Sequence, residues 1–302
     1  MIPRGGTELM MANLSQKLGG WPSSLNLIVS NCSLHQIDPN KKNIVWQHLD
    51  TDQEASQGAA DPQFQQAVSC WIFVSEWQRQ KWINHFGIDP QNTVVIRNAI
   101  HSFHWQPKPP SQQVEMIYTS TPWRGLDVLL DAVDQLSHQN WRLTVYSSTI
   151  IYGKGFSDST MRGYQPLFDR CRQHPRIRYI GYGLNQAVRK SLQGSHLWVY
   201  PSTFPETSCV SAIEAASAGC QIVTTRLGAL EETLGDNACF VDYNSNKLEL
   251  AATFASVLDK QLNRYNSTNP QWQNQALLFD KLYSWDTRIQ EWKILLNQLV
   301  AE

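Results

Sequence analysis

The chain lacks a strong excess of charge of either sign. Its 25 lysines and arginines nearly balance 26 acidic residues, so the formal net charge is −1. Nucleic-acid-binding proteins usually carry a basic surface, so we expect no nucleic-acid partner. No apolar run reaches the roughly 20 residues of a membrane-spanning helix, and no secretory signal is evident. We therefore expect a cytoplasmic protein that contacts a membrane at most peripherally.

Motifs for metal ions and redox cofactors are also missing. The six cysteines are scattered, without a C-x-x-C pair or a nearby histidine cluster. This pattern favours reduced thiols over disulfides or a zinc site. No G-x-G-x-x-G follows an early strand, which argues against an NAD-dependent enzyme. No Asp-x-Asp-type cation site stands out either, so we expect neither a metal nor a cofactor.

The segments that are present alternate between strand-like and helix-like runs. With 302 residues and 42% hydrophobic content, the chain is long enough for two modest globular domains. Alternation of this kind is typical of parallel α/β sheets. Strands are predicted at 25–30, 43–46, 71–74, 93–97, 114–119, 142–147, 176–180, 197–200, 221–224 and 238–241. Helices are predicted at 7–18, 62–68, 76–86, 125–136, 164–172, 185–194, 208–218, 247–263 and 285–300, and a proline-containing linker at 98–111.

Two glutamates carry the most chemical information. Glu206 and Glu214 stand eight residues apart, around the predicted start of a helix of small residues. That spacing is slightly more than two helical turns, so Glu214 should point back toward the loop that carries Glu206. Carboxylates accept bonds from sugar hydroxyls, and a helix N-terminus binds phosphate. Ordinary solvated glutamates are the alternative, although the apolar flanks indicate a packed helix.

The segment from Pro201 to Ala215 resembles the E-x7-E motif of retaining glycosyltransferases, most closely those of family 4 with the GT-B fold. The similarity covers most of the chain and is strongest over 177–243. It implies an α/β protein with two Rossmann-like domains that face a cleft. Residues 1–103 would form the acceptor-side domain, 104–284 the nucleotide-sugar-binding domain, and 285–302 a helix that crosses back to the first domain.

The resemblance also assigns roles around the two glutamates. Glu206 would hold hydroxyls of the transferred sugar, and Glu214 would accept bonds from the ribose hydroxyls. The backbone N–H groups of Ser208, Cys209 and Val210 would lie near the phosphates at the helix N-terminus. No carboxylate of the first domain presents itself as a covalent nucleophile, which favours substitution on one face of the sugar.

Two features of the first domain fit the resembled family. Gly5 and Gly6 precede the first helix and resemble the loop that closes over the donor diphosphate, although a simple turn is the alternative. The family usually has a hydrophobic strand before this turn, and its absence here predicts a shortened first domain, by truncation or as a compact variant. His48 follows a strand and matches a histidine near the transferred sugar, or else a structural strand-end histidine.

The cations of the diphosphate site match only in part. Arg124 takes the position of the family's lysine before a Gly-Leu pair and can bind phosphate oxygens. The family's earlier arginine is replaced within Ser120-Thr121. Lys154 can supply a second cation, although its Gly-Lys-Gly setting is typical of a mobile loop. Tyr182 follows a strand at the place where relatives bind the base, and it can stack there or pack the surface.

The sequence therefore predicts a retaining glycosyltransferase with a nucleotide-diphosphate sugar as donor. The acceptor would be a hydroxyl of a glycan, a lipid-linked molecule or a small molecule, and glycan or polysaccharide assembly is the setting that the resemblance implies. Two alternatives stay open. One is a nucleotide-sugar epimerase on the same fold, and the other is a non-catalytic or partner-dependent protein that binds a sugar nucleotide.

Overall fold

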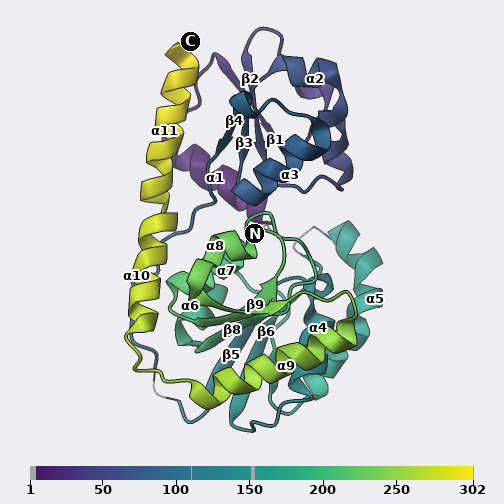
Figure 1. The fold of residues 1–302 in the computed structure, drawn as a ribbon, viewed down its shortest axis with the longest axis vertical. Helices are drawn as coiled ribbons and strands as arrows, with labels where there is room; N and C mark the ends of the chain where they lie inside the picture. Colours follow the sequence, from purple (N-terminus) through teal and green to yellow (C-terminus); the bar gives the residue numbers. More distant parts are fainter. Residues whose placement is uncertain (1–4, 110, 151–153, 302) are drawn as a thin grey trace.

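Two parallel β-sheets form the centres of two α/β units, which lie one above the other in Figure 1. The computed structural model describes residues 5–109, 111–150 and 154–301. Two long helices run along one side of the molecule and connect the units (Figure 1). We refer to the unit with the smaller sheet as the first unit and to the other as the second unit.

The first unit has a four-stranded sheet in the order β1-β2-β3-β4, with every neighbouring pair parallel. Its elements are α1 (Gly6–Leu18), β1 (Leu25–Val29), η1 (Leu34–Gln36), β2 (Lys42–Gln47), η2 (Glu54–Ala60), α2 (Pro62–Ala67), β3 (Val68–Phe73), α3 (Glu76–Phe86), η3 (Pro90–Asn92) and β4 (Thr93–Val95). Strand β2 is buried along nearly its whole length, as expected for a central strand covered on both faces.

The second unit has a six-stranded parallel sheet in the order β10-β9-β8-β5-β6-β7. Its elements are β5 (Val114–Thr119), η4 (Pro122–Arg124), α4 (Leu126–Val133), β6 (Trp141–Tyr146), α5 (Lys154–Gln173), β7 (Ile177–Tyr179), α6 (Asn185–Gly194), β8 (Leu197–Tyr200), α7 (Val210–Ser217), β9 (Gln221–Arg226), α8 (Leu230–Leu234), η6 (Gly235–Asn237), β10 (Ala238–Asp242) and α9 (Lys247–Arg264). The strand order reverses between β5 and β8. In open parallel sheets, ligands bind beyond the carboxyl ends of strands at such a reversal.

The chain passes between the units twice, and the two passages are bonded together. Ile100 N donates to the carbonyl of Tyr283 at 2.7 Å, and Trp285 N donates to the carbonyl of Ile100 at 3.1 Å. Helix α10 (Gln271–Tyr283) precedes this point and packs on α7, and α11 (Trp285–Ala301) follows it. The buried face of α11, with Trp285, Ile289 and Trp292, belongs to a hydrophobic cluster with β1, β2 and α1 of the first unit.

Most predicted elements are present, and the differences have physical causes. Strand β3 begins at Val68, three residues before the predicted strand, because α2 ends at Ala67. Helix α5 begins at Lys154 instead of 164, although Gly155 and Gly163 are poor helix formers. Helices α8 and α10 were not predicted, although Trp272, Ala276 and Phe279 form a helical buried stripe in α10.

Two further observations concern the helices and the cysteines. None of the helices in the described part of the chain combines the length and the apolar character needed to cross a bilayer. All six cysteines carry free thiols, and five of them are buried.

Candidate functional site

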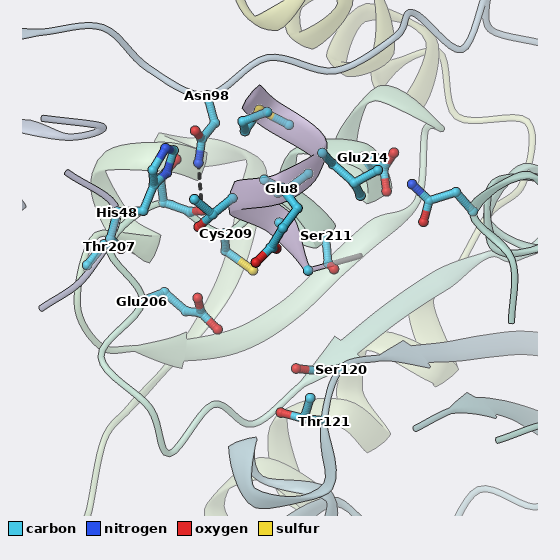
Figure 2. A pocket seen from close by; sticks show the side chains of 18 of the residues that line it. Glu8, His48, Asn98, Ser120, Thr121, Glu206, Thr207, Cys209, Ser211 and Glu214 are labelled. Atoms are coloured by element: carbon cyan, nitrogen blue, oxygen red, sulfur yellow. Dashed lines mark hydrogen bonds between the residues drawn. The ribbon is translucent and has the colours of Figure 1, made fainter. Parts of the chain in front are cut away.

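A cavity of about 800 Å³ lies between the two units. Its first-unit wall comes from the start of α1 and from the ends of β1 and β2. Its second-unit wall comes from the residues after β5, β7 and β8 and from the start of α7. Both Glu206 and Glu214 line this cavity, together with every described side chain predicted for the site (Figure 2).

Glu206 is held by two partners from the second unit and is only 5% exposed. The Arg124 guanidinium donates from Nη1 to both carboxylate oxygens, at 2.9 and 3.2 Å. The Tyr200 hydroxyl donates to Oε1 at 2.5 Å, and burial raises the pKa of Tyr200 well above its usual value, so it stays a donor. The carboxylate therefore has a neutralising partner before any ligand binds.

The loop that carries Glu206 depends on a glycine from another loop. Gly228 has φ +63°, and a Cβ at this position would lie 2.5 Å from the backbone N and O of Glu206. The N–H of Ala229 donates to the Glu206 carbonyl at 2.7 Å. Because only glycine accepts both this conformation and this close approach without strain, Gly228 fixes the backbone of Glu206.

Glu214 lies on α7 and pairs with a residue that the sequence analysis missed. The Arg189 guanidinium in α6 donates to Glu214 Oε1 at 3.0 Å and to the carbonyls of His101 and Ser102 at 2.8 and 3.1 Å. Burial raises the pKa of Glu214, and the charge of Arg189 opposes that rise. The two glutamates thus share the cavity, but each has its own arginine, and Cys209 lies between them in Figure 2.

The N-terminus of α7 faces the cavity, but the helix starts two residues later than predicted. Cys209 is the N-cap residue, and its side chain makes no capping bond. Ser208, Cys209 and Val210 all line the cavity. The first backbone N–H groups of a helix have no partner within the helix, so they are available to an anion. Burial raises the pKa of the Cys209 thiol well above its usual value, so the thiol stays protonated.

His48 follows β2 on the opposite wall of the cavity. Its ring packs against Trp46, with ring centroids 4.5 Å apart. The ring is partly exposed to the cavity, but its Nε2 atom is buried and has no hydrogen-bond partner among the described residues. Burial lowers the pKa of His48 to about 3, so the ring is neutral at physiological pH. It can give or accept one hydrogen bond, but it is not a cation.

Hydrogen bonds join the two walls of the cavity next to His48. The Thr207 hydroxyl donates to the His48 carbonyl at 2.8 Å, and Asn98 Nδ2 donates to the Ser208 carbonyl at 3.3 Å (Figure 2). These bonds bring His48 and the start of α7 together across the cavity. Sequence reasoning missed Asn98 and Thr207, because nothing in their local pattern marks a contact between residues so far apart.

Gly5 and Gly6 line the cavity at the start of α1. Figure 2 shows the Glu8 side chain, one turn further on, pointing into the cavity. Glu8 is therefore a first-unit carboxylate at the site. Sequence reasoning missed Glu8, because only the fold directs the first turn of α1 toward the second unit.

The cations around the cavity are few. Arg124 follows β5, and Gly125 places it there: with φ +107°, a Cβ on Gly125 would lie 2.0 Å from the Pro201 carbonyl. Among the described residues that line the cavity, Arg124 is the only lysine or arginine. Thr121, near the position of the missing family arginine, lines the cavity with a buried hydroxyl that has no partner among the described residues.

The two other predicted donor contacts have different outcomes. Lys154 is the first residue of α5, and its side chain lies outside the part that the structure describes. Tyr182 lies beyond the end of β7, lines the cavity and is 37% exposed. A ring in this position can stack on a planar ligand.

Metal ligands do not gather in the described part of the chain: no group of three or more His, Cys, Asp or Glu side chains is placed to hold an ion there. Asp50-Thr51-Asp52 has the spacing of an Asp-x-Asp motif, but the contacts of Asp50 are with other residues of the first unit. Asp50 is buried and accepts from Lys81 Nζ at 2.6 Å and from the Thr51 N–H at 2.7 Å. Its role is structural.

Two parallel α/β units around a shared cavity define the architecture of GT-B glycosyltransferases. The structure is similar to a glycosyltransferase from Rickettsia africae, with a TM-score of 0.68 and 15% identity, covering 98% of this chain and 80% of that one. It is also similar to HepE from Anabaena in complex with UDP and glucose, with a TM-score of 0.70 and 15% identity, covering 85% and 72%. The expected α/β fold of GT-B type is confirmed.

The match to a known family lies in the second unit. Residues 115–260 match the model of the family of glycosyl transferases group 1, which confirms the resemblance to glycosyltransferases. A human relative, which is one of the subunits of phosphatidylinositol N-acetylglucosaminyltransferase, is 26% identical over 55% of this chain. The corresponding protein of Arabidopsis thaliana is 22% identical over 71% of it. The chain spans 34% and 46% of the lengths of these two relatives.

Proposed function

We propose that this protein transfers a sugar from a nucleoside diphosphate sugar to a hydroxyl group of an acceptor, with retention of anomeric configuration. The observation that carries the proposal is the joint position of Glu206 and Glu214 in one cavity, with the N-terminus of α7 at the same wall. A sugar nucleotide has a ribose, a diphosphate and a hexose in this order. The cavity offers a carboxylate, a helix end and a second carboxylate, which suit these three groups.

The donor would lie along the second-unit wall. The base would stack on Tyr182, and Glu214 would accept bonds from the ribose hydroxyls. The diphosphate would bind the N–H groups at the start of α7, with those of Gly5 and Gly6 opposite. Glu206 would hold the hydroxyls of the transferred sugar. Lys154 remains a proposed second cation.

Substitution on one face of the sugar accounts for retention. The bond between the anomeric carbon and the phosphate oxygen breaks, the acceptor oxygen bonds to the same carbon from the same side, and its proton passes to the departing phosphate. Negative charge grows on the phosphate, and Arg124 and the N-terminus of α7 would stabilise it. His48 would orient the sugar as a neutral hydrogen-bonding group. These protein groups suffice in this scheme, so we propose that the protein requires no metal ion.

A partner-dependent role is the second candidate, and one observation favours it. Arg124 is already paired with Glu206. Among the described residues that line the cavity it is the only arginine, so the same side chain would have to neutralise Glu206 and bind the diphosphate. The human relative is named as one component of a multi-subunit enzyme, and a solved GtfA/B complex is among the similar structures. A partner could then supply a missing cation or part of the acceptor site.

A ligand panel tests both candidates. Wild-type protein and Glu214→Ala are heated with UDP, GDP, ADP and CMP and their common sugars, with and without EDTA, and the transition temperature is measured. The proposal expects one nucleotide to stabilise the wild type, EDTA to leave that shift unchanged, and the variant to lose it. Product analysis then separates transfer from epimerisation. If no nucleotide shifts the transition, the donor proposal is wrong for the isolated chain, and the partner-dependent candidate gains.

The setting of the reaction is part of the same proposal. We expect glycan or polysaccharide assembly in the cytoplasm, with a glycan, a lipid-linked molecule or a small molecule as acceptor. Contact with a membrane would be peripheral.

A further inference from the structure

Ser30 has an unusual backbone conformation at the edge of the cavity. It directly follows β1, and its φ of 60° lies in the left-handed region. In the described part of the chain, only one other non-glycine residue, His104, has a positive φ. This conformation costs energy for an L-residue with a Cβ, and such residues cluster where their geometry serves a ligand.

The surroundings hold Ser30 in this conformation. Its N–H donates to the Trp46 carbonyl of the neighbouring strand at 3.1 Å. Two residues later, the Cys32 N–H donates to the Ala55 carbonyl of η2 at 2.9 Å. A Cβ on Gly58, also in η2, would lie 1.7 Å from the Cys32 carbonyl oxygen. The turn is therefore clamped between β2 and η2, so Ser30 cannot relax without moving both.

The clamped side chain has a polar atom without a partner. Ser30 lines the cavity, and its buried Oγ has no hydrogen-bond partner among the described residues. The same holds for two further atoms of this wall, His48 Nε2 and Asn98 Oδ1, and Asn98 is only 5% exposed. Buried polar atoms in proteins are almost always hydrogen-bonded. Three such atoms on one wall can bond to a ligand that has several hydroxyl groups.

The charges of this wall restrict the chemistry of that ligand. Among the described first-unit residues that line the cavity, Glu8 is the only one with a full charge. His48 is neutral, and burial lowers the pKa of His101 below its usual value. A phosphate or carboxylate would meet Glu8 here and would find no lysine or arginine among the described residues of this wall. Apolar side chains, including Leu27, Val29 and Leu49, complete the wall and suit the C–H face of a sugar ring.

We propose that Ser30 binds the acceptor, and that the acceptor is an uncharged, sugar-like polyol held by the Ser30 hydroxyl on the first-unit wall. The inference rests on the proposed function, because it takes the second-unit wall as the donor side. It adds the acceptor class and the residue that selects it. Because the described residues of this wall offer Glu8 and no lysine or arginine, we expect a phosphorylated acceptor to bind more weakly than an uncharged one.

Ligand binding to the full chain tests the proposal without turnover. Methyl glucoside, methyl galactoside and N-acetylglucosamine serve as uncharged probes, and glucose 6-phosphate and inositol 1-phosphate serve as charged ones. Binding is measured by saturation-transfer NMR with and without UDP. The variants are Ser30→Ala, which keeps the Cβ, and Ser30→Gly, which also relieves the backbone. Ser69→Ala is the control, since Ser69 is exposed on β3 away from the cavity.

We expect at least one uncharged probe to bind. Ser30→Ala should raise the dissociation constant of that probe by about fivefold, as for one lost hydrogen bond. Ser30→Gly should weaken binding equally while raising the transition temperature, which separates the hydroxyl from stability. Ser69→Ala should bind as the wild type does. The proposal is overturned if no uncharged probe binds, if Ser30→Ala binds normally, or if the phosphorylated probes bind as tightly. Loss of UDP binding alone would refute the donor proposal but not this site.

Discussion

Removing Arg189 should destabilise the protein through Glu214, and the size of the effect follows from the contacts. Arg189→Ala removes a 3.0 Å ion pair with Glu214, two bonds to the linker carbonyls of His101 and Ser102, and a guanidinium 3.7 Å from the Phe103 ring centre. Both side chains of the pair are about four-fifths covered. A charged hydrogen bond of this kind contributes about 1.5–3 kcal/mol, so we expect a loss of about 3 kcal/mol in the free energy of unfolding.

The pH dependence of this loss has a definite sign. Burial already raises the pKa of Glu214 in the folded state, so its folded form binds protons more readily than its unfolded form. The stability associated with this group is therefore present at low pH and is lost as pH rises through its folded-state pKa. Without Arg189 the pKa rises further. The cost of Arg189→Ala should thus be smaller near pH 4.5, where protonation of Glu214 weakens the ion pair and mainly the contacts with His101, Ser102 and Phe103 are lost, and full at pH 8.

Thermal and urea unfolding at pH 4.5 and pH 8 measure this difference. Arg264→Ala is a matched control, since Arg264 is exposed at the end of α9. Glu214→Gln completes a double-mutant cycle, in which Arg189→Ala should cost less when no charge is left behind. An equal loss of unfolding free energy at both pH values, together with no coupling in the cycle, would refute the reasoning. Arg189 would then stabilise the protein only through its bonds to the linker carbonyls.

Four further predictions concern the cavity. Glu206→Ala should reduce turnover by at least about a hundredfold while a nucleotide still shifts the transition temperature, and full activity would remove Glu206 from the site. Arg124→Ala should weaken binding of a nucleoside diphosphate more than that of the nucleoside in calorimetric titrations, and equal losses would contradict a phosphate role. Gly228→Ala should lower activity as Glu206→Ala does, because its Cβ would displace the Glu206 backbone, and a normal rate would show that the loop adapts. His48→Asn should leave the shape of the pH–rate profile between pH 5 and 8 unchanged, since the pKa of His48 is about 3, whereas loss of an inflection near neutral pH would show that His48 titrates there.

Local patterns predicted the framework of the fold well. The bounds of α3, β5, α6 and β8 agree with the predicted ranges. Helix α10 was missed although its buried face is regular. Three of its leucines, Leu277, Leu278 and Leu282, are exposed, so its apolar residues are not confined to one stripe. The domain boundaries at 103 and 284 stay predictions.

The site could be predicted only as a set of separate motifs. Gly5, His48, Arg124, Glu206 and Glu214 all line the same cavity. Their pairing could not be inferred, because Arg124 reaches Glu206 across 82 positions of sequence.

The missed residues carry no such motif. Glu8, Asn98 and Arg189 become relevant only when α1, the linker and α6 are placed against the second unit. Local spacing finds residues on one element, whereas contacts between elements depend on the whole topology.

The position of α11 has a consequence for how the protein is made. Trp292 has no exposed surface and packs against Trp46 of β2, with ring centroids 4.9 Å apart. A ribosome releases the chain from its N-terminus, and domains usually fold in that order. Here the first sheet cannot complete its core until α11 has left the ribosome, whereas the second unit has all its strands by then. The half that is synthesised first is therefore the half that finishes folding last.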